Sequence, residues 1–273
     1  MPAPSRPLIL LSLLACLSAC APAAETPGPQ AGDPPGAGAL PALAPLPAIR
    51  TFGPYQPQPP ARSNVQIAQD ILDLEFLMES GRPLASLTRF KGPITIGFDS
   101  PLPAEFAPVI RADLDRLIAR FRTEAGLDVS KARPGTTPTI AIDFRPRAEL
   151  GHAVPSAACF VVPNAASFAD YTRGQSNPDY DWTRIPERRQ ARVFIPDDIS
   201  PQEIRDCLHE ELAQAMGPLN DLYRLSDSVF NDDNFHAVLT GFDMLALKVH
   251  YAPDLANGMS RAEVAAQKGF GIA

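Results

Sequence analysis

Two adjacent carboxylates, followed by an amide one helical turn later, are the residues of this chain with the clearest chemical potential. They are Glu210, Glu211 and Gln214, within the segment S-P-Q-E-I-R-D-C-L-H-E-E-L-A-Q-A-M-G-P. A carboxylate can act as a general base, and a carboxylate–amide pair can bind a polar ligand. Each role has a structural alternative. Glu211 could be a buried acceptor satisfied by protein donors, and Glu210 with Gln214 a hydrogen-bonded pair on a helix surface.

This segment is predicted to form a helix with a well-defined start and end. Ser200 can cap the helix, Pro201 fits its first position, and Glu203 completes a capping box. Gly217 followed by Pro218 is a stop signal. At about 100° per residue, four apolar side chains fall within one sector of about 80°, which predicts a buried face. They are Ile204, Leu208, Leu212 and Ala215.

The composition favours an acidic globular protein. The chain has 273 residues, which is room for one large domain or two small ones. Its 31 prolines are concentrated in the N-terminal quarter. The net charge of −7 argues against a nucleic-acid partner, because phosphate binding requires a basic surface. No apolar run reaches the ~20 residues needed to span a bilayer.

The N-terminal residues are predicted to be a signal peptide that is removed from the mature protein. Residues 1–19 combine one basic residue with a short apolar run. The sequence Leu17-Ser18-Ala19-Cys20 resembles the bacterial lipobox. That resemblance implies cleavage before Cys20, which then carries the lipid. An ordinary secretory signal is the alternative.

A tether is expected between the lipid and the folded domain. Residues 20–61 are rich in Pro, Ala and Gly, with few charges and no apolar period, so we expect them to be disordered. This leaves 62–273 as the folded domain. By resemblance to known sorting rules, Ala21 after the lipidated cysteine favours the outer membrane over the inner one, with the domain facing the periplasm.

Two cysteines are left once Cys16 leaves with the signal and Cys20 carries lipid. They are Cys159 and Cys207, and an even pair in an oxidising compartment predicts a disulfide. Such a bridge would close a loop of roughly 50 residues and stabilise the domain by about 4 kcal/mol. It would attach the predicted helix to the strand that carries Cys159. Two buried thiols are the alternative.

The remaining elements predict one α+β domain, in which helices pack on a small mixed sheet. Helices are predicted over residues 64–80, 103–125, 201–216 and 240–250, and from Ser260 onward. Strands are predicted over residues 93–98, 138–144, 157–162 and 192–195. The strand at 157–162 is apolar throughout and is therefore expected to be central. In the loop over 164–190, Tyr180 and Trp182 either line a ligand cleft or form a loop tip packed on the domain.

The predicted helix resembles the zinc-binding helix of metzincin peptidases. That family carries H-E-x-x-H-x-x-G-x-x-H, in which histidines at i and i+4 bind one metal and the Glu activates water. From Glu210 this chain reads E-E-x-x-Q-x-x-G-x-x-N, with Asp221 next. The resemblance implies a zincin-like fold, with Glu211 as general base and Asn220 or Asp221 in the third ligand position. Because Glu210 and Gln214 replace both histidines, we expect no metal and no other cofactor.

The chain also resembles an uncharacterised family of bacterial envelope lipoproteins. The E-E-L-x-Q helix, the strand that begins Pro93-Ile94 and the run Phe230-Asn231-Asp232-Asp233 carry this resemblance. It covers about residues 62–265 and implies no established activity.

Three functional hypotheses follow from these observations. The first is a lipid-anchored cell-envelope protein whose degenerate zincin-like domain binds or scaffolds an envelope protein or peptide in its cleft. The second is an unusual peptidase-like hydrolase with Glu211 as general base. The third is a purely structural envelope lipoprotein. In each of them the N-terminal lipid makes the membrane a partner.

Overall fold

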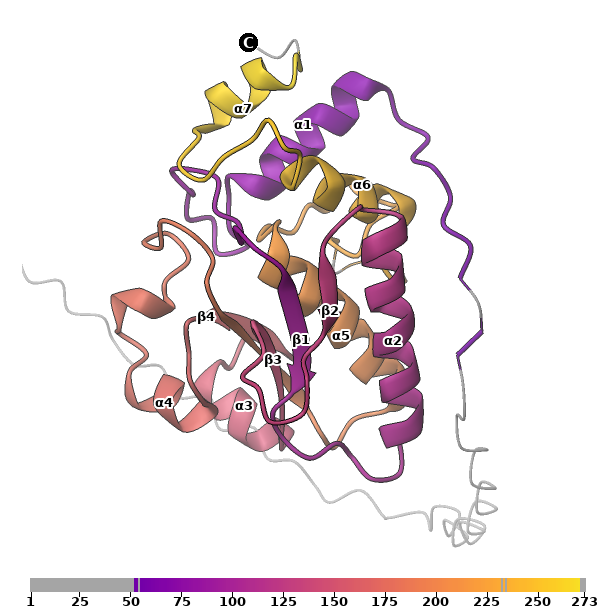
Figure 1. The fold of residues 1–273 in the computed structure, drawn as a ribbon, viewed down its shortest axis with the longest axis vertical. Coiled ribbons are helices and arrows are strands. Elements are labelled where there is room, and N and C mark those ends of the chain that lie inside the picture. Colours follow the sequence, from indigo (N-terminus) through magenta and orange to yellow (C-terminus); the bar gives the residue numbers. More distant parts are fainter. Residues whose placement is uncertain (1–51, 54, 232, 234, 271–273) are drawn as a thin grey trace, which may run out of the picture. The chain divides into compact units, whose positions relative to one another are not determined.

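A five-stranded mixed sheet with helices on both faces forms the core of the structure, a computed structural model (Figure 1). The structure describes residues 52–53, 55–231, 233 and 235–270. The expected signal peptide, Cys20 and most of the expected tether lie outside this part of the chain. Within it, the predicted α+β class and the single folded domain are confirmed. None of the described helices combines the length and apolar character needed to cross a membrane.

The elements have the following bounds. The helices are α1 (Asn64–Glu75), α2 (Ala107–Thr123), α3 (Arg147–Ala153), α4 (Phe168–Arg173), α5 (Pro201–Met216), α6 (Gly241–His250) and α7 (Arg261–Gln267), with a 3-10 helix η1 (Pro178–Tyr180). The strands are β1 (Ile94–Phe98), β2 (Val129–Lys131), β3 (Ile140–Arg145), β4 (Phe160–Pro163) and β5 (Ala191–Pro196). Each predicted helix and strand is present, but β2, α3, α4 and η1 were not predicted, since they are too short to show a period.

The strand order is β2-β1-β3-β5-β4. Strands β1, β2, β3 and β5 run parallel, and β4 runs antiparallel to β5. The prediction of a central strand at 157–162 was therefore wrong, because β4 lies at the edge. Its side chains are apolar because both of its faces are covered: Val161 faces the cluster around α5, and Val162 faces Phe194 and the aromatic residues of α4. An apolar strand indicates that both faces of the sheet are covered at that strand. It does not indicate that the strand has a neighbouring strand on each side.

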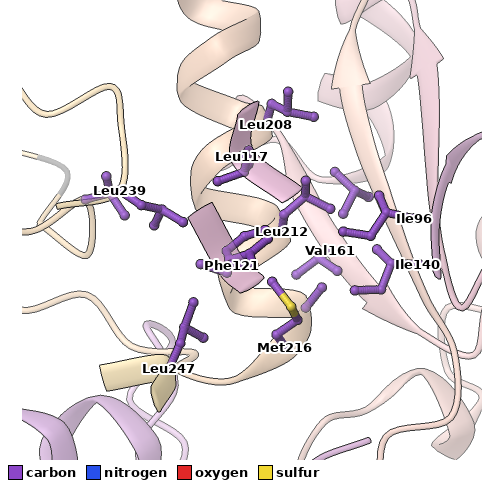
Figure 2. Close-up of a cluster of buried hydrophobic side chains, with 14 of the residues drawn as sticks. Ile96, Leu117, Phe121, Ile140, Val161, Leu208, Leu212, Met216, Leu239 and Leu247 are labelled. Carbon is purple, nitrogen blue, oxygen red and sulfur yellow. The ribbon is translucent and has the colours of Figure 1, made fainter. Parts of the chain in front are cut away.

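The main core lies between the sheet and helices α2 and α5. The predicted buried face of α5 is confirmed, since Ile204, Leu208, Leu212 and Ala215 are at most 1% exposed. Figure 2 shows Leu212 of α5 beside Val161 of β4, in the same cluster as Phe121 of α2. A smaller cluster on the opposite face of the sheet joins α3 and α4 to β4 and β5.

Helix α1 ends earlier than predicted, at Glu75 instead of near Ser80. The apolar residues that suggested a longer helix belong to a turn that follows it. There Leu77 bridges to Pro83, and Met78 bridges to Leu219 just beyond α5. The chain therefore stays buried after the helix has stopped, which periodicity alone cannot distinguish from a helix.

Residues 52–53 and 55–62, which we call the N-terminal strap, contact the domain, although most of them were expected to be tether. Phe52 lies under the guanidinium of Arg205 at 4.2 Å, and Tyr55 lies under that of Arg120 at 4.8 Å. Such cation–π contacts contribute about 0.5–1 kcal/mol each when partly exposed. The described folded part therefore begins about ten residues before the predicted boundary at 62.

Gly241, the first residue of α6, lets the strap approach. A Cβ at this position would overlap with the carbonyl oxygen of Gln58 in the strap. The sequence offers no sign of this contact, because a glycine at the start of a helix is also compatible with an exposed turn.

We expect Gly241→Ala to displace the strap and lower the free energy of unfolding by about 1–3 kcal/mol, the usual cost of overpacking. Hydrogen exchange should show faster exchange of strap amides, and urea unfolding should give the stability. Gly92→Ala is the matched control, since a Cβ at Gly92 meets nothing within 4 Å. If Gly241→Ala were as stable as wild type or more stable, as helix propensity alone predicts, the strap would not be held at this point.

Candidate functional site

A groove of about 1000 Å³ runs beside α5. Helix α5 forms one wall with the residues that sequence analysis selected, and β4 with the loop over 154–158 forms another. Met78 to Ser80, after α1, and Leu219, after α5, also line it. The lining residues of α5 are Glu203, Asp206, Cys207, Glu210, Glu211 and Gln214.

The start of α5 is fixed by the predicted capping box. The Ser200 hydroxyl accepts a hydrogen bond from the Glu203 N–H at 3.2 Å, and the Glu203 carboxylate accepts one from the Ser200 N–H at 2.9 Å. The Ser200 cap sets where the first turn begins and so determines which face each later residue occupies. Polar residues at 206, 210 and 214 consequently line the groove while the apolar stripe enters the core.

The end of α5 is held by a buried arginine. Arg188 donates from Nη1 to the carbonyl oxygen of Ala215 at 2.8 Å and from Nη2 to that of Gly217 at 2.5 Å, and it is 3% exposed. Its guanidinium lies 4.5 Å from the centre of the Trp182 ring, and Trp182 lines the groove. Burial lowers the pKa of Arg188 to about 10, so the side chain is charged at neutral pH and complements the negative end of the helix dipole.

The predicted disulfide is present in the groove wall. Cys159 and Cys207 are bonded, with their Cα atoms 5.9 Å apart and a sequence separation of 48 residues. The bridge attaches the residue before β4 to the middle of α5, as sequence analysis predicted. Because both cysteines line the groove, this bond fixes the distance between its two main walls.

Glu210 and Gln214 form the expected pair, with a third residue that the sequence did not indicate. The Gln214 amide donates to Glu210 at 3.4 Å and to Glu79 at 2.6 Å. Glu79 lies in the turn after α1, at a position that the prediction had placed inside a helix. The amide therefore connects the turn after α1 to α5 within the lining of the groove.

Glu211 lines the groove but is only 4% exposed. Its carboxylate lies at the boundary between the groove and the core. Asn220 and Asp221 are not among the described residues that line the groove. The Asn220 amide donates instead to the carbonyl oxygen of Asp73 in α1, at 3.0 Å. The structure thus brings Glu210, Glu211 and Gln214 together but does not bring Asn220 or Asp221 to them, and their binding roles stay predictions.

A buried aspartate orders a turn that contributes to the lining of the groove. Asp243 accepts hydrogen bonds from the Ser228 hydroxyl at 2.5 Å, from the Val229 N–H at 3.2 Å and from the Thr240 N–H at 2.7 Å. Burial raises the pKa of Asp243, against the opposing effect of these donors. Val229 and Asn231 of this turn line the groove.

Trp182 and Tyr180, the two aromatic residues considered in the loop over 164–190, lie on different sides of the sheet. Trp182 lines the groove and donates from its indole nitrogen to the carbonyl oxygen of Val161 at 3.3 Å. Tyr180 donates to Asp170 and packs with Tyr171 on the far side of the sheet. Trp182 therefore lines a groove, its role toward a ligand stays a prediction, and Tyr180 packs on the domain.

His209 lies on a face of α5 that is directed away from the groove. Its Nδ1 accepts the Leu239 N–H at 3.2 Å, and its Nε2 lies 3.4 Å from Asp113 of α2, which also pairs with Arg205. Burial is the largest cause that lowers the pKa of His209, with Asp113 opposing it and Arg205 adding to it. Protonation would break the Leu239 bond, so the imidazole is neutral in the folded state.

No group of three or more histidine, cysteine, aspartate or glutamate side chains in the described part of the chain is arranged to hold a metal ion. At the positions where the metzincin motif has histidines, the groove has the carboxylate of Glu210 and the amide of Gln214. These donors do not suit zinc.

The fold and the groove define an α+β domain in which a capped helix presents carboxylates to a concave surface. Residues 64–267 match the family described as protein of unknown function, DUF2927, so the chain belongs to that family. The match runs from the start of α1 to the end of α7 and includes the described groove walls, but not the strap. No curated protein matches the chain.

We expect Arg188→Met to lower the free energy of unfolding by at least about 3 kcal/mol, because it leaves several buried carbonyls without a charged donor. The measurement is urea unfolding followed by far-UV circular dichroism. Arg189→Met is the matched control, since the Arg189 side chain is 74% exposed and pairs with Glu187. Equal effects of the two substitutions would show that Arg188 does not hold the end of α5.

Stability should fall as the pH drops below about 6.5, the ordinary pKa of histidine in an unfolded chain. There the unfolded state binds a proton at His209 more readily than the folded state, whose pKa burial lowers, so His209 contributes a slope of at most about 1.4 kcal/mol per pH unit. His209→Gln should remove this part of the slope, whereas His152→Gln, at an exposed position in α3, should not. Parallel stability curves for His209→Gln and wild type between pH 7.5 and 5 would contradict the neutral buried imidazole.

Proposed function

We propose that this chain is a lipid-anchored cell-envelope protein whose domain binds a partner in the groove beside α5 without cleaving it. The lipid on Cys20, the periplasm-facing domain and the preference for the outer membrane rest on the N-terminal sequence. The binding role is supported by one observation above all. A groove of about 1000 Å³ is lined by the same polar face of α5 that the sequence singled out.

The degenerate zincin-like character is part of this proposal. It is supported by the E-E-x-x-Q-x-x-G frame on a helix that packs against the sheet, and by the turn with Val229 and Asn231 that borders the same groove. The position of Glu211, 4% exposed at the edge of the core, argues for binding over hydrolysis, because a general base must reach its substrate. A groove of this size also argues against a purely structural role.

The partner that fits best is an extended peptide segment of an envelope protein. The groove is bordered by an edge strand, β4, along with α5, so a segment in extended conformation could lie along both of them. The disulfide and the Arg188 hydrogen bonds hold both walls, so little ordering of the protein is needed when a peptide binds.

Binding can be tested with decapeptides selected from a random display library against the full chain. We expect Ala158→Trp, which fills the groove at its loop wall, to weaken binding of the selected peptides at least tenfold. Ala169→Trp is the matched control, since both alanines are exposed but Ala169 lies in α4, away from the groove.

Mass spectrometry of the same peptides tests the second part of the proposal. Intact peptides after prolonged incubation are expected. Cleavage that Glu211→Gln abolishes would establish the hydrolase hypothesis instead. Equal binding to the Ala158→Trp and Ala169→Trp variants would show that the groove is not the binding site.

A further inference from the structure

The groove is more acidic than the chain as a whole. Five carboxylates line it, against one arginine and one histidine among its described lining residues, whereas the complete chain has 31 acidic and 24 basic residues. The carboxylates belong to Glu79, Glu203, Asp206, Glu210 and Glu211. The basic residues are Arg147 and His236.

Among the described contacts, one of these carboxylates pairs with a cation of the groove, and two others are joined through an amide. Arg147 lies 3.4 Å from Glu203, so it compensates one carboxylate near the start of α5. Glu79 and Glu210 both accept from the Gln214 amide, which donates hydrogen bonds but adds no positive charge. Partial loss of solvent raises the pKa of Asp206, Arg205 opposes the rise, and the carboxylate of Glu203 adds to it.

A concave surface strengthens such a field. Walls of low dielectric constant concentrate the field of like charges in a groove and raise the local concentration of oppositely charged ligands. Carboxylates at positions 206, 210 and 211 follow α5 along the groove, and Glu79 faces them through the Gln214 contact. A ligand with several positive charges spaced along its length would therefore be favoured over one with a single charge.

A peptide fits this pattern better than a metal ion. No metal-binding arrangement of side chains is found in the described part of the chain, so a compact divalent cation has no preformed site there. Lysine and arginine side chains carry their charge on long flexible stems, which can reach separate carboxylates while apolar parts lie on the groove wall. Phe160, Val161 and Trp182 add apolar atoms to the lining of the groove.

We propose that the groove binds an extended peptide segment rich in lysine or arginine. This inference rests on the proposed binding function and specifies the chemistry of its partner. Asp206 and Glu210 determine the preference for positive charge, and the walls that hold the segment are those joined by the Cys159–Cys207 bridge.

Three labelled decapeptides of equal length test the proposal by fluorescence anisotropy on the full chain. They alternate alanine with lysine, with glutamine or with glutamate. We expect the lysine peptide to bind at least tenfold more tightly than the glutamine peptide, and the glutamate peptide to bind most weakly. Raising the salt concentration should weaken binding of the lysine peptide, because part of its attraction is screened.

A pair of double variants separates a local preference from the effect of net charge. Asp206→Asn with Glu210→Gln removes two negative charges from the groove, and the preference for the lysine peptide should fall at least tenfold. Glu105→Gln with Asp115→Asn removes two negative charges from exposed positions outside the groove and should leave the preference unchanged. Equal losses in both double variants would overturn the proposal.

The remaining outcomes separate this proposal from the function it rests on. If the three peptides bind equally and Ala158→Trp weakens all of them, the groove binds peptides but does not select positive charge, and only the present inference fails. If Ala158→Trp weakens none of them, binding outside the groove is indicated, and the proposed function fails with it.

Discussion

The arrangement of this domain depends on the hydrogen bonds that buried, positively charged Arg188 makes at the end of α5. Arg188 satisfies carbonyl oxygens that the end of a helix leaves without partners, and it does so from inside the protein. Its second contact, on the ring of Trp182, places an aromatic residue in the groove wall. The capping box at Ser200 holds the start of α5, and the Arg188 hydrogen bonds hold its end. Each face of the helix therefore packs against the same neighbour along its whole length.

Each face of α5 contacts a different part of the domain. The apolar face fills the core against the sheet, and the face with His209 packs on α2 through Asp113. The third face presents carboxylates to the groove, where the disulfide holds β4 at a fixed distance. A partner in the groove would therefore meet a preformed surface, which suits recognition more than a chemical step that requires an accessible base.

The sequence predicted the local features of this arrangement and missed the distant ones. Ser200, Glu203 and Gly217 act on neighbours along the chain, so the bounds of α5 could be predicted, and the pairing of Cys159 with Cys207 followed from counting. Glu79 and Arg188 act on residues far away in the sequence, and nothing in their local pattern indicates a partner. The edge position of β4 was mispredicted for a related reason, because helices on both faces make an edge strand as apolar as a central one.

A crystal structure of the chain with the alternating alanine–lysine decapeptide would test the central claim most directly, namely that the groove is a non-catalytic site for a cationic segment. We predict an intact, extended peptide in the groove that α5 and β4 line, with lysine side chains within about 4 Å of the carboxylates of Asp206 and Glu210. A peptide bound elsewhere, or one cut beside Glu211, would contradict the account.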